Sequence, residues 1–412
     1  MKEIFDFLDQ SADTAVELES ELTKRPALSP DSGGEGEIDK CLFLESWLRS
    51  RGIVNLERHD APDPRAKEGI RPNLIATIPG KDDDTSRLWI ISHLDVVPPG
   101  EMRLWDSDPW KLVVKDGRLI GRGVEDNQQG LCSSVLAALA LNHAGITPPR
   151  TVKLLFAADE ETGSTYGIIW LLANRTLFHK GDIVLIPDSG DPQGDTIEIA
   201  EKKQLWLKLT TIGRQCHASV PDLGNNAFLA ASDLVVKLHN GLSNAFADRD
   251  PLFDLDYSTF QPTKKEANVP NINTIPGEDV FHMDCRILPH YSIEAVLAET
   301  KRLAEEIEKQ YKVTVDVGVV QYHYSVPTPK DAPVVRFLIR AITEVYGISP
   351  RCIGIGGGTI AAPLRNAGID CAVWAKLGDS AHQPNEYAFI DNIIGDAKVM
   401  ASLMVDKDQL NN

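Results

Sequence analysis

The chain has 412 residues, which is more than one ordinary hydrophobic core supports, so two domains are expected. Its 42 basic and 60 acidic residues give a net charge of −18, which argues against nucleic acid or an anionic membrane as a partner. The N-terminal segment lacks the basic and apolar regions of a signal peptide, and no apolar run is long enough to span a bilayer.

The first part of the chain is expected to form two helices followed by an α/β sandwich. Apolar residues at helical spacing predict helices over residues 3–24 and 36–51, and a third pattern ends at a glycine in 131–145. Four short apolar runs predict strands: PNLIATIP (72–79), LWIISHLD (88–95), TVKLLFAA (151–158) and DIVLIPD (182–188). Because these runs are almost continuously apolar, helices should cover both faces of a largely parallel sheet.

The pattern changes between residues 204 and 319. Three alternating segments predict strands with one buried face: LWLKLTTI (205–212), VFHMDCRI (280–287) and KVTVDVGV (312–319). Helical patterns at 226–242 and 292–311 lie between them, and NINTIPG is expected to add a strand. The order β-α-β-β-α-β predicts a small ferredoxin-like α+β sheet with helices on one face.

Buried runs return after residue 320, for example in CAVWAKLG (371–378). We therefore expect an α/β domain made of residues 1–203 and 320–412, with residues 204–319 inserted into it as a second domain.

Histidines and carboxylates follow the ends of several expected strands. They are His93 and Asp95 after LWIIS, Glu160 and Glu161 after LLFAA, Asp188 after IVLIP, His382 after AVWAKLG, and Asp126 just before the 131–145 helix. In open α/β sheets, ligands bind beyond the carboxyl ends of the strands. Any one of these residues alone is more often an ordinary surface group, but together they suit a borderline divalent metal, zinc first.

Five motifs, in this order, resemble those of one family: SHLDVV, GRGVEDNQQG, ADEETGS, IPDSG and SAHQPNEY. Over essentially its whole length the chain resembles the two-zinc amidohydrolases and exopeptidases. These include acetylornithine deacetylase, succinyl-diaminopimelate desuccinylase, aminoacylase and glutamate carboxypeptidase. The resemblance implies a zinc-peptidase catalytic domain that carries an inserted lid and dimerisation domain.

The resemblance also implies the ligand set. Asp126 would bridge two Zn²⁺ ions, with His93 and Asp188 completing one site and Glu161 and His382 completing the other. Three protein ligands per metal and a shared water suit four-coordinate catalytic zinc, for which Co²⁺ or Mn²⁺ could substitute. Two such ions can activate the water and polarise an amide carbonyl.

Two neighbouring acids have other implied roles. Asp95 would hold the His93 ring in its ligating tautomer. Glu160 resembles the general base, which takes the proton of the water and passes it to the leaving nitrogen. Asp159 is expected only to shape the turn.

The inserted segment GRQCHASVPDLGNNAF resembles the lid signature of the family. The resemblance implies that His217 reaches the active site of the other subunit of a homodimer and helps to stabilise the oxyanion. Asn273 and Arg286 match positions that grip a substrate carboxylate, which a guanidinium fits bidentately. The alternative for Arg286 is an ion pair with Asp284 inside the domain.

The segment GIGGGTIAAP (354–363) has neither the lysine of a P-loop nor the third glycine of a dinucleotide fingerprint. The resemblance implies instead that Gly357 and Gly358 line the substrate pocket through backbone groups. The chain departs from the frequent Asp-Met-Lys-Gly motif of the family, since Asn127, Gln128 and Gln129 follow Asp126. The missing lysine leaves the substrate subfamily open.

Together these features predict a two-zinc hydrolase that cleaves an N-acyl amino acid or a short peptide carrying a free carboxylate. Deacylase and exopeptidase remain open, because specificity depends on pocket shape. The alternative is a metal-free descendant that acts as a binding or scaffolding protein, which loss of a ligand or of the base would favour. The six cysteines are scattered without a C-x-x-C pair, so we expect a cytoplasmic protein.

Overall fold

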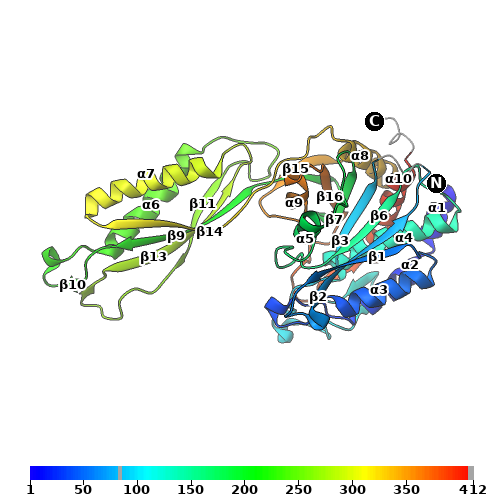
Figure 1. Ribbon diagram of the computed structural model, residues 1–412, viewed down its shortest axis with the longest axis horizontal. Helices are drawn as coiled ribbons and strands as arrows, with labels where there is room; N and C mark the ends of the chain where they lie inside the picture. Colours follow the sequence, from blue (N-terminus) through cyan, green and yellow to red (C-terminus); the bar gives the residue numbers. More distant parts are fainter. Residues whose placement is uncertain (82–85, 407–412) are drawn as a thin grey trace. The chain divides into compact units, whose positions relative to one another are not determined.

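The computed structural model describes residues 1–81 and 86–406 and divides the chain into two compact units (Figure 1). The first unit comprises Met1–Ile199, Thr328–Cys352 and the chain from Thr359 onwards. The second comprises Ala200–Pro327 and Ile353–Gly358. The segment 204–319, expected as an inserted domain, lies within the second unit, which also includes the short glycine-rich segment after residue 352.

The first unit is a layered α/β structure. Its helices are α1 (Lys2–Asp9), α2 (Ala12–Thr23), α3 (Ile38–Ser50), α4 (Gly130–His143), α5 (Ile168–Asn174), α8 (Pro333–Tyr346), α9 (Ala361–Asn366) and α10 (Ile390–Val405). An eight-stranded sheet contains β1 (Leu56–Pro62), β2 (Ile70–Ile78), β6 (Val152–Ala157), β3 (Leu88–His93), β7 (Ile183–Asp191), β16 (Cys371–Lys376), β8 (Thr196–Glu201) and β15 (Arg351–Ile355), in that spatial order. A small sheet contains β4 (Val113–Lys115), β5 (Arg118–Ile120) and β17 (Tyr387–Phe389).

The centre of the large sheet is parallel, as the continuous apolar runs predict. Strand β3 pairs in parallel with β6 and β7, and β7 pairs in parallel with β16, whereas β1 and β2 are antiparallel additions at one edge. Alternate residues such as Trp89, Leu155 and Val184 pack with α5 and α9 into one core cluster. Helices α4, α8 and α10 pack on the sheet as well, so the central strands are buried on both faces (Figure 1).

The expected helix over residues 3–24 is wrong, because the structure ends α1 at Asp9 and starts α2 at Ala12. At the break, the backbone N–H groups of Gln10 and Ser11 bond to carbonyls three residues back, at Phe7 and Leu8. The Ser11 hydroxyl also donates to the Phe7 carbonyl at 2.8 Å. A short polar side chain that bonds to nearby backbone competes with helix continuation, which apolar spacing alone does not reveal.

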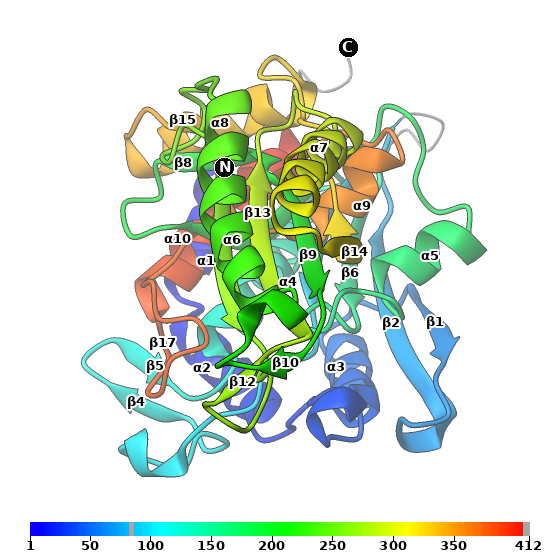
Figure 2. The ribbon, with the colours of Figure 1, turned by 90° about the vertical axis from the view of Figure 1, so that its left-hand side faces the viewer.

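The four strands of the larger sheet of the second unit and its two helices follow the predicted order β-α-β-β-α-β, and two short strands lie between them. Its elements are β9 (Lys203–Ile212), β10 (Cys216–His217), α6 (Ala227–Ala245), β11 (Thr259–Lys265), β12 (Thr274–Ile275), β13 (Glu278–Ile287), α7 (Ile293–Tyr311) and β14 (Thr314–His323). The antiparallel sheet has the order β11-β13-β9-β14. Helices α6 and α7 lie side by side and share one core with it, to which the apolar residues of β13 contribute as expected (Figure 2).

The prediction that NINTIPG forms the second strand of this sheet is wrong. NINTIPG does not supply it, because β12 pairs with β10 in a separate two-stranded sheet. The second strand of the motif is β11, an edge strand that is mostly exposed and contains Pro262 at a register shift. Proline and a polar pattern are tolerated at a sheet edge, and they hide such a strand from pattern-based prediction.

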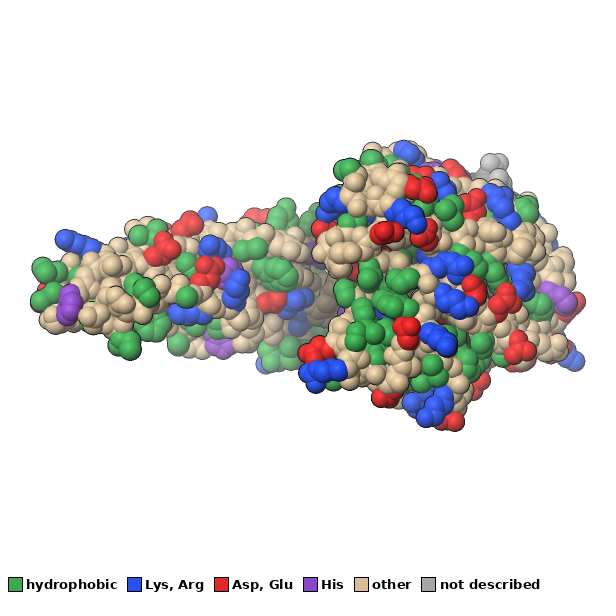
Figure 3. All heavy atoms as spheres, turned by 90° about the horizontal axis from the view of Figure 1, so that it is seen from below, with side chains coloured by type: hydrophobic (Ala, Val, Ile, Leu, Met, Phe, Trp, Pro, Cys, Tyr) green, Lys and Arg blue, Asp and Glu red, His purple; other side chains and the backbone are tan. Residues whose placement is uncertain are grey.

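Two surface properties accompany this fold. Within the described ranges, no helix combines the length and apolar character needed to cross a membrane. On the face of the first unit that Figure 3 presents, acidic and basic side chains are interspersed.

A buried ion pair connects α9 to β8 in the first unit. Arg365 is 4% exposed and Glu198 is 1% exposed. The guanidinium nitrogens lie 2.8 and 3.1 Å from the two carboxylate oxygens. Removing one partner of such a pair leaves an uncompensated buried charge, which is strongly destabilising.

We therefore expect Glu198→Gln to lower the free energy of unfolding by about 3 kcal/mol, measured by urea denaturation. The matched control is Glu45→Gln in α3, which breaks the surface pairs of Glu45 with Arg49 at 2.9 Å and with Arg58 at 3.9 Å. That change should cost at most about 0.5 kcal/mol. If the two substitutions lower the free energy of unfolding equally, the buried pair contributes no more to stability than the surface pairs.

Candidate metal centre

The sequence-predicted ligands meet at the carboxyl edge of the parallel strands. His93 is the last residue of β3, Glu161 follows β6, and His382 lies between β16 and β17. Asp126 lies in the irregular turn Val124–Gln129 that leads into α4. Since β3, β6, β7 and β16 are parallel neighbours, their carboxyl ends point to one edge of the sheet.

Asp188 lies inside β7 rather than after it, because that strand continues to Asp191. The pairing between β7 and β16 is irregular at this point: Ile186 pairs with Val373, and the next pair is Gly190 with Ala375. Residues 187–189 therefore face a single residue of β16. An irregularity of this kind redirects a side chain, here that of Asp188.

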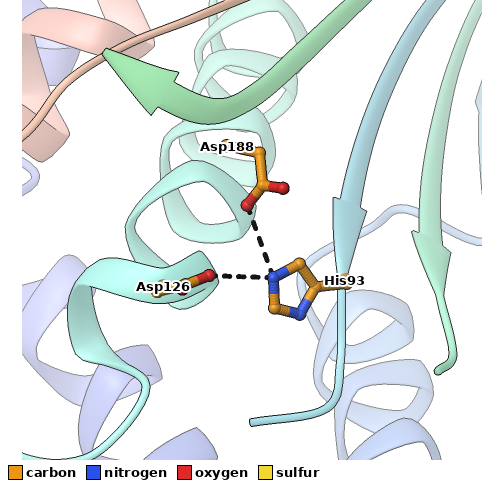
Figure 4. A group of neighbouring side chains, drawn as sticks. All are labelled: His93, Asp126 and Asp188. Carbon is orange, nitrogen blue, oxygen red and sulfur yellow. Dashed lines mark hydrogen bonds and ion pairs between the residues drawn. The ribbon is translucent and has the colours of Figure 1, made fainter. Parts of the chain in front are cut away.

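The structure brings the five residues together in two groups that share Asp126. In the first group, His93 Nε2 lies 3.0 Å from Asp126 Oδ1 and 3.4 Å from Asp188 Oδ1 (Figure 4). In the second, His382 Nε2 lies 3.0 Å from Asp126 Oδ2 and 3.1 Å from Glu161 Oε2. Within each group the donor atoms all lie within 4.8 Å of one another. Each Asp126 oxygen thus faces a different group.

Asp95 orients three neighbours at once. Its backbone carbonyl oxygen lies 3.0 Å from His93 Nδ1, so in the neutral ring this nitrogen donates and Nε2 keeps the lone pair that faces Asp126. Its carboxylate accepts the backbone N–H groups of Glu160 and Glu161, each at 3.0 Å. A single buried side chain therefore fixes the turn after β6 relative to the end of β3.

A second buried network supports the same turn. Asp159 has a left-handed backbone (φ 64°), and its Oδ2 accepts the N–H of Tyr166 at 3.0 Å. Arg71, fully buried in β2, lies 3.3 Å from the Asp159 carboxylate and forms a bidentate pair with Glu37. The Glu37 carboxylate also accepts the N–H of Asp159 at 3.2 Å. Asp159 thus shapes the turn and anchors it to β2.

The electrostatics of the centre indicate a missing positive charge. Burial, and then the charge of Asp188, raise the pKa of Glu160 well above its usual range, and burial raises the pKa of Glu161 to about 7. Hydrogen bonds to Asp126 and Glu161 raise the pKa of His382 to about 10. Burial opposes charging of His93, but the neighbouring Asp188 charge and its hydrogen bonds raise its pKa well above the usual range. Four carboxyl groups (Asp126, Asp188, Glu160 and Glu161) thus share the centre with two imidazoles.

The residues present fit a metal by their chemistry as well as by their charge. Imidazole and carboxylate donors, three in each group, suit zinc and related divalent ions. Glu161 Oε1 is buried and has no hydrogen-bond partner in the described part of the chain. An orphaned buried carboxylate oxygen is costly unless a cation or donor satisfies it.

The residues assigned to the lid lie in the second unit. His217, in β10, is exposed, and its Nδ1 accepts the backbone N–H of Ser219 at 3.1 Å, so the neutral ring carries its proton on Nε2. Asn273 is exposed just before β12, and its carbonyl accepts the N–H of Ala218 at 2.9 Å. Gly357 and Gly358 are exposed in the segment after β15.

Arg286 is half-buried on the polar face of β13 and is engaged within its own unit. Its Nε and Nη2 lie 2.7 and 3.0 Å from the two oxygens of Asp284, and its Nη1 donates to the Gly356 carbonyl at 2.9 Å. The structure therefore contains the ion pair that was the alternative to substrate binding. These contacts use three of the five guanidinium N–H groups, so two N–H groups can still donate to another acceptor.

Comparison with known proteins names the family. A model of peptidase family M20/M25/M40 matches residues 89–406. The chain is 38% identical over 414 residues to an uncharacterised metallohydrolase of Methanococcus maripaludis, and the match covers 95% of this chain and 99% of that relative. This chain belongs to peptidase family M20/M25/M40.

Other known proteins resemble it over almost their whole length. A succinyl-diaminopimelate desuccinylase of Sulfurimonas denitrificans is 27% identical over 382 residues, covering 92% of this chain and 95% of that protein. The solved structure of an aminopeptidase of Bacillus cereus superposes with a TM-score of 0.76 at 21% identity, covering 97% of this chain and 99% of that one. The M20/M25/M40 assignment makes this protein a metallohydrolase and implies a divalent metal, which the two donor groups fit.

Three residues that hold the donor groups or their loops in place were not predicted from the sequence. Asn127 donates from its amide nitrogen to the Pro187 carbonyl at 2.5 Å and to Asp188 Oδ1 at 2.7 Å. Glu125 and Glu386 bond to the loops that carry His382 and Asp126. All three lie in GRGVEDNQQG or SAHQPNEY. The signal that could have revealed them is a polar residue close in sequence to an expected ligand.

Proposed function

We propose that this member of the M20/M25/M40 family is a two-zinc hydrolase that cleaves the amide bond of an N-acyl amino acid or short peptide carrying a free carboxylate. One observation carries the proposal: two donor groups share Asp126, and the Glu160 carboxyl lies beside them without belonging to either. This division matches what amide hydrolysis needs, namely groups that hold cations and one nearby group that moves protons.

In this proposal His93, Asp126 and Asp188 hold one Zn²⁺, and Asp126, Glu161 and His382 hold the other. Three mixed nitrogen and oxygen donors per ion suit catalytic zinc, and Co²⁺ or Mn²⁺ would substitute in such a set. When bound, the ions polarise the substrate carbonyl and make water more acidic. Asn127 orients Asp188, and the Asp95 carbonyl keeps His93 in its ligating tautomer.

Glu160 is the general base in this scheme. It takes a proton from the attacking water as the new C–O bond forms, and it returns that proton to the nitrogen as the C–N bond breaks. Its backbone N–H is held by Asp95, so the carboxyl stays beside the donor groups without being a ligand. A raised pKa, caused first by burial, suits a group that must both accept and release a proton near neutral pH.

The second unit supplies substrate contacts in this proposal. His217 would donate from Nε2 to the developing oxyanion in the other subunit of a homodimer, and its bond from Ser219 supports that tautomer. Arg286 and Asn273 would hold the substrate carboxylate, with Arg286 using the two N–H groups that Asp284 and Gly356 leave free. Backbone groups of Gly357 and Gly358 would line the substrate pocket.

A metal-free binding or scaffolding protein is the alternative function. It is disfavoured because every predicted ligand and the predicted base are present, and because all five ligands converge in two groups. We place the enzyme in the cytoplasm, since all six cysteines are free thiols and four of them are buried.

Substitution of the two adjacent glutamates tests the proposal. Glu160→Gln keeps the shape of the side chain but removes the base, so turnover should fall by about 10²–10⁴-fold while zinc content and KM persist. Glu161→Gln should instead reduce bound zinc from two ions per chain to one and lower the melting temperature, because bound metal stabilises the fold. Elemental analysis and steady-state kinetics on N-acetyl, N-succinyl and dipeptide substrates measure both.

The pair is assigned backwards if Glu160→Gln loses zinc and Glu161→Gln keeps it. Near-wild-type turnover of Glu160→Gln would show that Glu160 is not the general base. If the wild-type protein holds no metal and its properties do not change when a chelator is added, the binding-protein alternative is favoured instead.

Arg286→Ala tests the carboxylate contact. If Arg286 anchors the substrate, KM for substrates with a free carboxylate should rise by about 10–100-fold, as expected for loss of charge-assisted hydrogen bonds, with kcat little changed. Amidated analogues should be poor substrates of both proteins, with equal KM. Asp284→Ala is the matched control, because it frees the guanidinium and should not raise KM. Equal losses on both kinds of substrate would make Arg286 structural.

A further inference from the structure

Two glutamates that belong to neither donor group connect the loop of Asp126 to the loop of His382. Glu125 directly precedes Asp126, and Glu386 follows His382 in the segment before β17. Both are buried, with exposed fractions of 1% for Glu125 and 0% for Glu386. Each carboxylate accepts hydrogen bonds from the backbone of the loop that carries the other.

Glu386 holds the segment around Asp126. Its Oε1 accepts the N–H of Glu125 at 2.9 Å and the N–H of Asp126 at 3.1 Å. Its Oε2 accepts the N–H of Gly123 at 2.9 Å and a guanidinium N–H of Arg122 at 2.5 Å. The backbone position of the shared ligand therefore depends directly on Glu386.

Glu125 holds the segment before His382 in return. Its Oε2 lies 2.5 Å from the Ser380 backbone nitrogen and 2.7 Å from the Ser380 hydroxyl, and its Oε1 accepts the N–H of Gly378. The fit leaves no room for a larger residue, since a Cβ on Gly378 would lie 3.0 Å from Glu125 Oε1 and 2.7 Å from the Tyr387 ring.

The loop that Glu125 holds has an unusual backbone. Asp379, His382 and Asn385 have φ values of +63°, +64° and +60°, in the left-handed region that residues with a side chain rarely adopt. These residue types tolerate that region better than most, but three in one short loop still need support from outside the loop. The bonds to Glu125 are such support, and they lie within four residues of His382.

We propose that Glu125 and Glu386 act as positioning residues, a reciprocal clamp that sets the separation of Asp126 and His382 and thereby the affinity of the metal position formed by Asp126, Glu161 and His382. This inference rests on the proposed two-metal function. Partners that orient ligands in this way commonly change metal affinity by about 10–100-fold when they are removed.

The effect of Glu125 should be confined to one metal position. His93 ends β3 and pairs with Ala157 of β6, and Asp188 lies within β7 between paired residues, so neither of them is bonded to Glu125. Asp126 keeps its own bond from Glu386 when Glu125 is changed. His382, by contrast, lies in a loop whose hydrogen bonds to Glu125 would be lost or reversed by an amide.

Zinc titration of the full chain in two backgrounds tests this. Asp188→Asn disables the His93 position, and Glu161→Gln disables the His382 position. On chelator-stripped protein, Glu125→Gln should weaken Zn²⁺ binding about 10–100-fold in the Asp188→Asn background. In the Glu161→Gln background the same change should alter affinity by less than about twofold, as for independent sites.

Three further variants separate positioning from general destabilisation. Glu198→Gln also removes a buried carboxylate of the first unit and should leave zinc affinity unchanged in both backgrounds. Ser380→Ala removes the hydroxyl contacts with Glu125 and with the Tyr387 backbone but keeps the Ser380 N–H bond to Glu125, so it should cause a smaller loss confined to the Asp188→Asn background. Gly378→Ala crowds both the Tyr387 ring and Glu125 Oε1 and should weaken Zn²⁺ binding in the Asp188→Asn background.

Equal loss in both backgrounds, or no loss in either, would overturn the inference. If Glu125→Gln does not fold, unchanged zinc affinity of Ser380→Ala in the Asp188→Asn background would overturn it instead. Failure of the wild-type chain to bind Zn²⁺ is a distinct result, because it refutes the proposed function and the clamp together.

Discussion

The centre depends on Asp126, because its two carboxylate oxygens face two different imidazoles. Oδ1 lies 3.0 Å from His93 Nε2, and Oδ2 lies 3.0 Å from His382 Nε2. No other described residue belongs to both donor groups, so a displacement of this one side chain would disturb both. The surrounding chain accordingly fixes the backbone of Asp126 through the buried carboxylate of Glu386.

The same arrangement concentrates negative charge where folding alone does not require it. Asp126, Asp188, Glu160 and Glu161 converge at one sheet edge, and like charges that are withdrawn from water repel strongly. Burial is the main cause of the raised pKa values of Glu160 and Glu161, and the neighbouring carboxylates add to it. Sites at which several groups are perturbed together are typical of function, and bound cations would remove the imbalance.

Much of the fold and of the site could be predicted because each rests on a local signal. Continuous apolar runs indicate strands covered on both faces, and the carboxyl ends of parallel strands meet at one edge, so His93 and Glu161 could be expected near each other. Contacts between distant loops leave no such signal. The bond of Glu125 to Ser380 joins two loops far apart in the chain, and the edge strand β11 contains a proline in a polar segment. Spacing could not decide between substrate and Asp284 as the partner of Arg286, since both are carboxylates.

Anomalous diffraction from crystals grown with Zn²⁺, recorded on both sides of the zinc absorption edge, tests the central claim most directly. The account predicts two peaks per chain, about 3.5–4 Å apart, as in other two-metal sites. One should lie among His93, Asp126 and Asp188, and the other among Asp126, Glu161 and His382. A single peak, no peak, or a pair that does not share Asp126 would contradict it.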